Sequence, residues 1–341
     1  MQDGYFTMMQ HLAPDLAQEI ELRALVLERI GALQPVGRRQ LAARLNLPER
    51  EVRTVAALLK KHGLITLDAA GMCLTPKATE VLPMARRFSR DLRGLTALET
   101  ALSERLAVDR VCVVAGDADV DPHVLSEVGR SAGMRLRGFL QTGSTLAVTG
   151  GSTIREVAFS VPQGTPMNVM VVPARGGMGG ALETQANTLA CEIARRLGGH
   201  HRMMHLPDHL DEQALAQMRK LTEIDETLAL LERADVVLHG IGRADDMTQR
   251  RQLPGAVSAE VLRKGAIAEA YGGYFDRRGR LVYSASTVAH DLGALKPGCA
   301  LIAVAAGAKK AEAIEAVMKN RRHAMLVTDE GAAKAILHKA P

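Results

Sequence analysis

Over the first hundred positions of the chain, apolar residues recur every three or four places, which is the spacing of an amphipathic helix. The pattern predicts a helix over 15–33 and a pair of short helices over 36–65 that meet at a tight turn at 46–48. Pro48 suits the first position of the second short helix, where a backbone N–H is not needed. Two extended runs around a glycine-containing turn over 66–76 predict a β-hairpin. The helices and the hairpin together predict a winged helix-turn-helix. A short arm at 1–15 precedes it.

A stripe of leucines follows this region. After a helical segment that starts at Thr75 and Pro76, the leucines recur at steps of three or four residues, at Leu92, Leu95, Leu98, Leu102 and Leu106. We predict a connector helix over 84–108, which separates a domain at 1–83 from a domain at 109–341. The stripe could be a dimer seam or could pack on its own domain, because so few heptads are a minimal coiled-coil signal.

From position 111 the pattern changes to short apolar runs, each followed by a small or glycine-rich turn and then an amphipathic segment. The runs lie at 111–116, 146–151, 169–177, 236–242, 301–307 and 325–331. Apolar runs without alternation indicate strands that are covered on both faces, so we predict an α/β domain with a doubly wound, mostly parallel sheet. In such sheets ligands bind beyond the carboxyl ends of the strands.

Charge and composition narrow the partners of the N-terminal domain. The chain has 341 residues and a modest formal net charge of +5. Positive charge is concentrated between positions 36 and 65, which contain seven Arg or Lys and only two carboxylates. Aromatic residues make up 3% of the chain and Trp is absent, which disfavours stacking on single strands and leaves duplex DNA as the expected partner. The alternative is an ordinary pair of helices whose basic residues form a solvated face.

The second short helix carries the residues that we expect to read DNA. Arg50, Arg53 and Thr54 fall on its outer side near the N-terminus, the part that enters a major groove in helix-turn-helix proteins. There an arginine can reach guanine and a threonine can reach a phosphate. The complete set of predicted DNA contacts is Arg38, Arg39, Arg50, Arg53, Thr54 and Lys60.

The four cysteines are scattered without the spacing of metal ligands. They fit a reducing cytoplasm and argue against structural zinc, so we expect small core residues and no metal site. The first residues lack the basic segment and apolar run of a signal peptide, and no window approaches the length of a membrane span. We therefore expect a cytoplasmic protein with no membrane partner.

The turn at 149–153 is the first candidate ligand site in the C-terminal domain. Gly150 and Gly151 would let the backbone approach a ligand, and Ser152 and Thr153 would offer hydroxyls at a helix N-terminus, where an anion is favoured. The alternative is a tight turn between strand and helix with a capping hydroxyl. The loop is neither GxGxxG nor a phosphate loop with GK[ST], so nucleotide binding is not indicated.

Cations and polar residues near other strand ends extend this candidate site. Arg175 directly follows a strand, and Lys310 lies at a helix start, where a cation gains nothing from the helix dipole. Together with the loop they predict a cationic pocket, in which Arg250 and Arg251 could supply a second phosphate contact. Further residues could bind hydroxyls, although on spacing alone a cap or a surface role is favoured for each of them: Gln185, Asn187 and Glu269.

Motifs in the same order along nearly the whole chain resemble those of the SorC/DeoR-type sugar-binding transcriptional regulators. Beside the helix-turn-helix and the leucine stripe, the motifs are VTGGST (148–153), VPARGG (172–177), QANT (185–188), HGIG (239–242), QRR (249–251) and VTDEGAA (327–333). The resemblance implies a repressor of a glycolytic operon with fructose 1,6-bisphosphate as inducer and no cofactor. Its effector domain would resemble sugar-phosphate isomerases of the glucosamine-6-phosphate deaminase and ribose-5-phosphate isomerase type, without their activity.

The resemblance also implies roles for the candidate residues. The loop 150–153 with Arg175 and Lys310 would hold phosphate, while Arg250 and Glu269 would contact the other phosphate and the sugar. Ser152 stands where the family pattern has Thr, and Ala306 where it has Gly, which leaves room for a different sugar phosphate.

An enzyme with an appended DNA-binding module is the competing hypothesis. A sugar-phosphate isomerase or deaminase needs a general base near the sugar carbon and an acid at the ring oxygen, and Glu269 and His239 are the candidates. Neither residue lies in a recognisable catalytic motif, so we assign no catalytic residues. Activation in place of repression stays open, as does assembly into a dimer or a tetramer over a two-fold operator.

Overall fold

The computed structural model describes residues 11–45, 47–175, 181–206, 212–251, 253–284 and 295–338. Several predicted features lie outside these residues: positions 1–10 of the arm, Asn46 of the turn, and Gly176 and Gly177 after Arg175. The chain divides into two compact units, an N-terminal unit Met1–Ala97 and a C-terminal unit Leu98–Pro341. The division into three parts at 83 and 108 stays a prediction.

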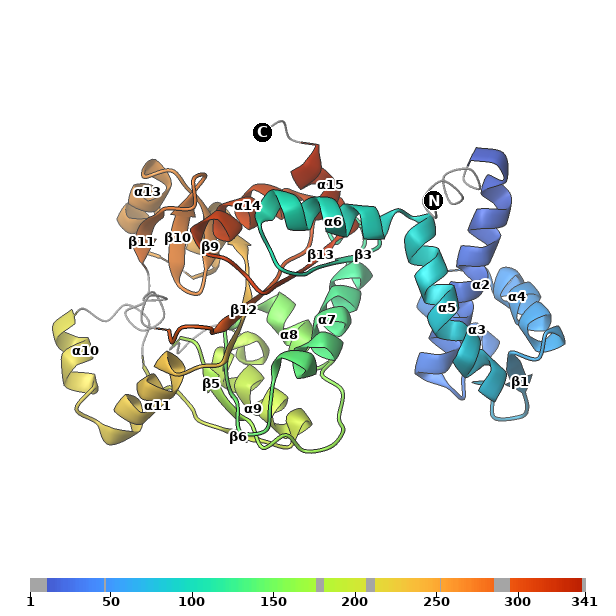
Figure 1. The fold of residues 1–341 in the computed structure, drawn as a ribbon, viewed down its shortest axis with the longest axis horizontal. Coiled ribbons are helices and arrows are strands. Elements are labelled where there is room, and N and C mark those ends of the chain that lie inside the picture. The colour runs from blue at the N-terminus through green and yellow to red at the C-terminus, as the bar shows by residue number, and fades with distance from the viewer. Residues whose placement is uncertain are drawn as a thin grey trace. The chain divides into compact units, whose positions relative to one another are not determined.

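The N-terminal unit has the helices and the hairpin that its apolar pattern predicts (Figure 1). In chain order they are α2 (Pro14–Leu33), α3 (Arg38–Leu45), α4 (Glu49–Lys61), β1 (Ile65–Leu67), β2 (Met72–Leu74) and α5 (Pro76–Leu92). Pro48 is not the first residue of α4, as the sequence suggested, but precedes it as the N-cap with an extended ψ of 135°. Glu49 and Glu51 occupy the first turn, where the helix dipole favours negative charge.

The apolar faces of these elements meet in one core. Val26, Ile30, Leu41, Val52 and Met72 are each 0% exposed and belong to a single cluster drawn from α2, α3, α4 and β2. Burying an aliphatic side chain of this size contributes about 1.5–3 kcal/mol. Because one face of α4 is buried in this core, its opposite face is exposed to solvent.

A bridge to the segment before α3 ties the wing to the helices. Val36 and Met72 exchange two backbone hydrogen bonds, of 3.1 and 2.8 Å. Between the two strands the Asp68 carboxylate accepts the N–H groups of Ala70 and Gly71, at 2.8 and 3.1 Å. Gly71 has a φ of +135°, and a Cβ there would lie 2.8 Å from the Val36 nitrogen, so only glycine allows this contact.

The predicted connector is two helices and not one. The helix α5 starts at Pro76, after Thr75 caps it by accepting the Ala78 N–H at 3.3 Å. It ends at Leu92, and α6 (Leu95–Leu106) begins after Gly94, which has a φ of +66°. Because a left-handed residue interrupts helical geometry, the leucine stripe does not run along one continuous helix. Leu102 is 0% exposed in the single chain, which favours packing on its own domain over an open dimer seam.

Strands and helices alternate in the C-terminal unit, as the apolar runs predict (Figure 1). After α6, the helices and the strands of the main sheet are β3 (Val111–Val114), α7 (His123–Leu136), β4 (Thr145–Val148), α8 (Ser152–Ala158), β5 (Met170–Pro173), α9 (Ala186–Leu197), β6 (His200–His201), α10 (Glu212–Met218), α11 (Thr222–Glu232), β7 (Val236–Gly240), α12 (Ala244–Arg250), α13 (Gly255–Arg263), β12 (Ala300–Val304), α14 (Ala311–Asn320), β13 (Met325–Asp329) and α15 (Glu330–Leu337). All six predicted strands form; the two-residue β6 was not predicted.

The main sheet has seven strands in the order β3-β13-β12-β7-β4-β5-β6, and each neighbouring pair is parallel. From β4 the chain proceeds outward to β5 and β6, whereas from β7 it proceeds toward the other edge through β12 and β13. The strand order therefore reverses between β4 and β7. Ligands in such sheets bind at this switch point, beyond the carboxyl ends of the strands.

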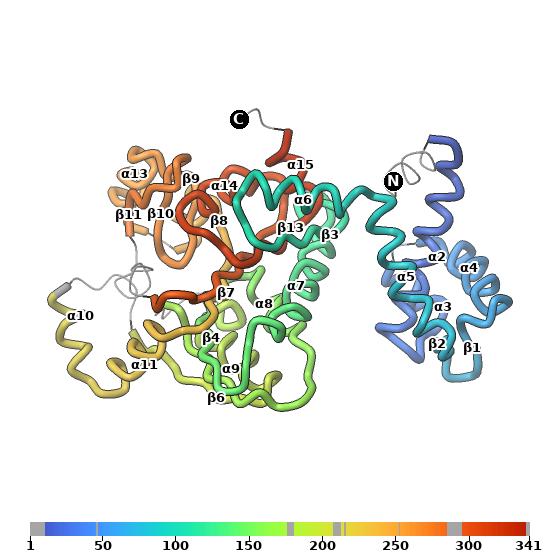
Figure 2. The backbone as a smooth tube through the Cα atoms, in the orientation of Figure 1, coloured from blue at the N-terminus to red at the C-terminus, as the bar shows by residue number. Residues whose placement is uncertain are grey.

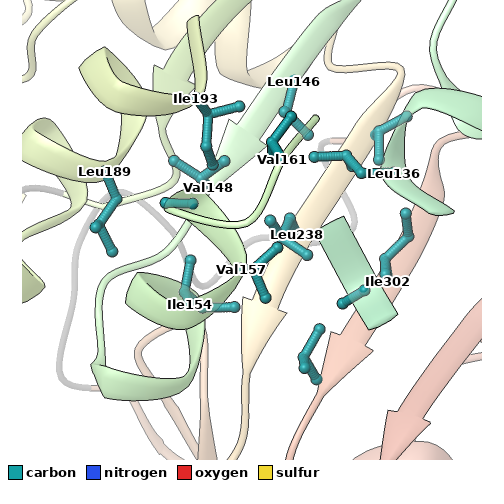
Figure 3. Close-up of a cluster of buried hydrophobic side chains, with 14 of the residues drawn as sticks. Leu136, Leu146, Val148, Ile154, Val157, Val161, Leu189, Ile193, Leu238 and Ile302 are labelled. Carbon is teal, nitrogen blue, oxygen red and sulfur yellow. The ribbon is translucent and has the colours of Figure 1, made fainter. Parts of the chain in front are cut away.

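Helices cover both faces of this sheet, and the side chains of β4 show how. Leu146 and Val148 point to the core shared with α7, α8 and α9, whereas Ala147 belongs to the cluster formed with α11. Figure 3 shows Ile154 and Val157 of α8 beside strand residues of the first core, and Figure 2 shows α7, α8 and α9 together. Alternation along a strand explains how one run of apolar residues fills two cores.

A second sheet, which the sequence analysis missed, lies outside this pattern. Its four antiparallel strands have the order β11-β10-β9-β8: β8 (Gly242–Arg243), β9 (Ala266–Ala270), β10 (Gly273–Asp276) and β11 (Leu281–Ser284). It packs on α13 through Val261, Ala266 and Tyr274. The strands have two to five residues, too short to show a period, and their partners are found only in three dimensions.

Candidate functional site

The first candidate site is the outer face of α4. Each of the six predicted DNA contacts is exposed: Arg38, Arg39, Arg50, Arg53, Thr54 and Lys60. Arg39 pairs with Glu49 at 3.4 Å, but both side chains are at least half exposed, so the pair contributes little. Within the described residues, Arg50 and Arg53 make no ion pair. Their guanidinium groups therefore need not give up a carboxylate in order to reach an anionic partner.

Position along α4 separates the predicted contacts into two groups. Arg50, Arg53 and Thr54 lie in its first half, where the Thr54 hydroxyl donates to the Arg50 carbonyl at 3.0 Å. Lys60 lies in the last turn, about 15 Å further along the helix axis from Arg50. A helix that places its first turn in a groove would therefore direct Lys60 to the sugar-phosphate backbone and not to the same bases.

The second candidate site begins at the switch point of the main sheet. Thr149 follows β4 and accepts the Gly240 N–H at 3.2 Å through its hydroxyl, so it joins the ends of β4 and β7. Gly151 has a φ of +118° and donates its N–H to the Thr184 carbonyl at 2.8 Å. A Cβ on Gly150 would lie 2.6 Å from that same oxygen. The two glycines are thus required for the close approach of the loop to the chain before α9.

The hydroxyl and amide residues around this loop differ in their surroundings. Ser152 is exposed at the start of α8, whereas Thr153 is buried. Gln185 is half-buried and caps α9 beside the loop. Asn187 bonds the Met204 backbone at both its N–H and its C=O, at 2.9 and 3.1 Å, which matches the structural role favoured on spacing.

Arg175 and Glu269 form the centre of a buried charge cluster. Arg175 follows β5, is 6% exposed, and places Nη1 3.8 Å from Glu269 Oε1. The same oxygen accepts Arg251 Nη2 at 2.6 Å and the Gly272 N–H at 2.9 Å. Burial raises the pKa of the Glu269 carboxyl, while the charge of Arg175 and the Gly272 N–H oppose that rise. The structure thus brings together two residues that are 94 positions apart, Arg175 after β5 of the main sheet and Glu269 in β9 of the second sheet.

Lys310 and Arg250 form a second cationic group. Lys310 is half-buried directly before α14, and Arg250 is exposed at the end of α12. Burial lowers the pKa of Lys310, and the charge of Arg250 lowers it further, against the opposing effect of Asp119 and Asp329. Since the two positive charges repel each other, an anion that contacts both would relieve their repulsion.

Carboxylates hold the backbone that carries Lys310. The three consecutive N–H groups of 307–309 donate to the carboxylates of Asp329, Asp117 and Asp119, at 2.8, 3.3 and 2.8 Å. Because these amides are occupied, Lys310 would reach a ligand through its side chain and not through the backbone of this segment. The three aspartates were not among the predicted site residues. Asp329 is the last residue of β13, and Asp117 and Asp119 follow the end of β3.

His239, the acid candidate of the enzyme hypothesis, is 0% exposed. Its Nε2 lies 2.9 Å from Nε2 of His323, and its ring meets Tyr271 edge-on at 4.8 Å. Burial and the neighbouring His323 lower the pKa of His239 to about 3, and burial lowers the pKa of His323 to about 4. The imidazoles are thus neutral near pH 7 and bonded to each other, which does not suit an acid that protonates a ligand.

Acidification from pH 7 to pH 5 is expected to lower the free energy of unfolding of the C-terminal unit by about 4 kcal/mol through these two histidines. Their folded pKa values of about 3 and about 4 lie below the ordinary 6.5. Only the unfolded chain therefore takes up protons as the pH falls through 6.5, and stability falls with it. Urea unfolding at the two pH values measures the loss. H323Q should remove about half of it and H200Q, at an exposed position, none; an unchanged loss in H323Q would contradict the assignment.

Comparison with known proteins identifies the two units. Residues 20–88 match the model of the "CggR N-terminal DNA binding domain", and residues 90–338 match that of the "Putative sugar-binding domain". A DNA-binding head joined to a sugar-binding α/β domain defines a sugar-responsive transcriptional regulator. The chain belongs to the SorC/DeoR family of sugar-binding transcriptional regulators.

Two similar proteins are each named "Central glycolytic genes regulator". The one from Priestia megaterium (strain DSM 319 / IMG 1521) is 37% identical over 332 residues and the alignment covers 97% of each chain. The one from Bacillus subtilis (strain 168) is 37% identical over 327 residues, with 96% of each chain covered. These relatives are transcriptional regulators and not enzymes, which decides between the two classes of function that the sequence left open.

Solved structures agree with the fold. A "putative SorC family transcriptional regulator" from Enterococcus faecalis has 35% identity and a TM-score of 0.66, covering 71% of this chain and 99% of that one. The full-length sorbitol operon regulator SorC from Klebsiella pneumoniae has 19% identity and a TM-score of 0.66. The match covers 89% of this chain and 94% of that one. No helix in the described part of the chain is long and apolar enough to cross a membrane.

Proposed function

We propose that this regulator represses genes of central glycolysis and that fructose 1,6-bisphosphate releases it from its operator. The observation that carries the proposal is the 37% identity, over 97% of the chain, to a protein named for the regulation of those genes. Two pairs of residues support a ligand with two anionic ends: Arg175 lies 3.8 Å from Glu269, and the charge of Arg250 acts on Lys310.

The proposed contacts follow from where the structure places the candidate residues. The loop of Gly150, Gly151, Ser152 and Thr153, at the switch point, would hold one phosphate together with Arg175. Lys310 and Arg250 would hold the other, because the charge of Arg250 acts on Lys310. Further contacts to sugar hydroxyls would come from Glu269 and Gln185. This assignment places Arg250 with Lys310, whereas the family resemblance alone divided them between the two phosphates.

Release of DNA requires that the effector bind the DNA-incompetent form more tightly than the DNA-competent form. An effector that binds both forms equally would shift nothing, and a nearly complete switch needs about a 10⁴-fold preference. We further propose that the protein acts in the cytoplasm as a dimer or a pair of dimers, so that two α4 helices read the two halves of a palindromic operator.

Fructose 1,6-bisphosphate is expected to release the wild-type protein from a labelled operator duplex, selected from random sequences by binding to the protein. Fluorescence anisotropy measures release during the titration. Fructose 6-phosphate should release the duplex only at higher concentrations, because it lacks one of the two anionic ends, and fructose should have no effect. Tight duplex binding that no phosphorylated sugar alters would refute the proposed control.

A further inference from the structure

Arg250 and Arg251 are adjacent in the sequence, but their charged groups serve different neighbours. The charge of Arg250 acts on Lys310, whereas Arg251 Nη2 donates to Glu269 Oε1 at 2.6 Å. The Arg251 side chain is 20% exposed and that of Glu269 is 5% exposed. A charge-assisted hydrogen bond this short, between groups this buried, is among the stronger interactions that a protein forms.

The two oxygens of Glu269 are used unequally. Oε1 accepts both Arg251 and the Gly272 N–H, and Arg175 Nη1 lies 3.8 Å from it. In the part of the chain that the structure describes, no group donates a hydrogen bond to Oε2. The protein thus occupies Oε1 with two fixed donors, which set the plane of the carboxylate. The lone pairs of Oε2 are left to accept from another group.

The charges around Glu269 decide whether that second oxygen can accept. The groups that face it are Arg175 after β5, Arg251 after α12, and Tyr271 with the Gly272 N–H in the turn between β9 and β10. Burial raises the pKa of the carboxyl and that of the Tyr271 phenol, so the phenol stays neutral. The charge of Arg175 and the Gly272 N–H lower the pKa of Glu269 against this rise. Arg251 lies closer, with Nη2 2.6 Å from Oε1 against 3.8 Å for Arg175, and an opposite charge at hydrogen-bond distance favours the ionised carboxylate.

We propose that Arg251 is a positioning residue that keeps Glu269 ionised and oriented, so that Oε2 accepts a ligand hydroxyl next to the phosphate on Arg175. An ionised carboxylate accepts from a hydroxyl and repels a phosphate, so this arrangement admits a phosphorylated polyol and disfavours a second anion at the same point. The inference rests on the proposed function in taking Arg175 as an effector contact. It removes Arg251 from the candidate phosphate ligands.

The titration of Glu269 tests the first half of this proposal without any effector. Carbon-13 NMR of the carboxyl carbon in full-length protein labelled at glutamate, with E269Q to assign the signal, gives the pKa directly. In R251Q the pKa of Glu269 should rise by about 1–3 units relative to the wild type, the effect of losing one close opposite charge. R251K keeps the charge and should restore most of the difference. A pKa equal in wild type and R251Q would overturn the proposal.

Ligand binding tests the second half. Calorimetry compares fructose 1,6-bisphosphate with inorganic phosphate, using R263Q, an exposed arginine of α13, as the control. At a pH between the pKa values of Glu269 that NMR gives for wild type and R251Q, R251Q should weaken binding of the bisphosphate by about 10- to 100-fold. Its affinity for inorganic phosphate should stay within about threefold of the wild-type value. The deficit should shrink as the pH rises further, because Glu269 then ionises without Arg251. If R251Q lost affinity for the bisphosphate and for inorganic phosphate equally at every pH, the role of Arg251 would be merely structural. Failure of wild type itself to bind the bisphosphate would refute the proposed function, while the NMR result would still decide the role of Arg251.

Discussion

Replacing Arg175 with alanine is expected to raise the concentration of fructose 1,6-bisphosphate that releases half of the operator by about 100-fold. The side chain is 6% exposed and its guanidinium lies 3.8 Å from the buried Glu269 carboxylate. Removal would delete the proposed bidentate donor to phosphate. It would also leave the negative charge of Glu269 less compensated at the proposed phosphate position. Attraction is thereby replaced by repulsion, which explains the large size of the expected effect.

Operator affinity without effector should change little in R175A, because Arg175 lies in the C-terminal unit and contacts no DNA in the proposed mechanism. R175K keeps a charge but loses the planar fork, so it should fall between the wild type and R175A. The control is R202A: Arg202 pairs with Glu226 at 3.4 Å, with both side chains about half exposed. Anisotropy titrations on all four proteins provide the comparison. A normal release curve in R175A would exclude Arg175 from the effector site.

Replacing either Arg50 or Arg53 with alanine is expected to weaken operator binding by about 10- to 100-fold and to relax the preference for the operator over random duplex. Both residues are exposed in the first half of α4, beside the buried Val52 that anchors the helix. Neither makes an ion pair within the described residues, so truncation should leave the stability of the unit nearly unchanged. Effector binding by calorimetry serves as the internal check that the C-terminal unit is intact.

Lys60 provides the contrast that separates base reading from backbone contact. K60A should weaken the binding of the operator and of random duplexes to the same extent. It should also reduce the number of ions released on binding, measured from the salt dependence, by about one. K319A, which removes an exposed lysine from the C-terminal unit, should alter neither. If R50A and R53A behaved as K60A does, α4 would be a backbone-binding helix and the operator would have to be read elsewhere.

The sequence predicted those parts of the structure whose signal is local. Apolar residues at a step of three or four predicted α2, α3 and α4, because one face of each helix must enter the core. Runs without alternation predicted six strands of the main sheet, because those strands are covered on both sides. The cations after strand ends were also recognisable, since Arg175 and Lys310 stand at positions where the local structure gains nothing from them.

Local signals failed where short segments depend on distant partners. The four strands β8 to β11 have too few residues to show a period, and α5 and α6 share a leucine stripe that Gly94 interrupts with a φ of +66°. Pro48 was placed one residue too far into α4, because capping and first helical positions differ only in ψ.

By itself, the sequence determined the two kinds of domain and the face of α4 that meets solvent. It also placed the cations of the proposed ligand site after strand ends. Only the tertiary structure decided which charges meet. Arg250 and Arg251 are indistinguishable as neighbours in a motif, yet one acts on Lys310 and the other holds Glu269, 18 positions away. The three aspartates that hold 307–309 reach it from β3 and β13. Such pairings depend on strand order and on distances of a few ångströms between segments far apart in the chain, which periodicity does not encode.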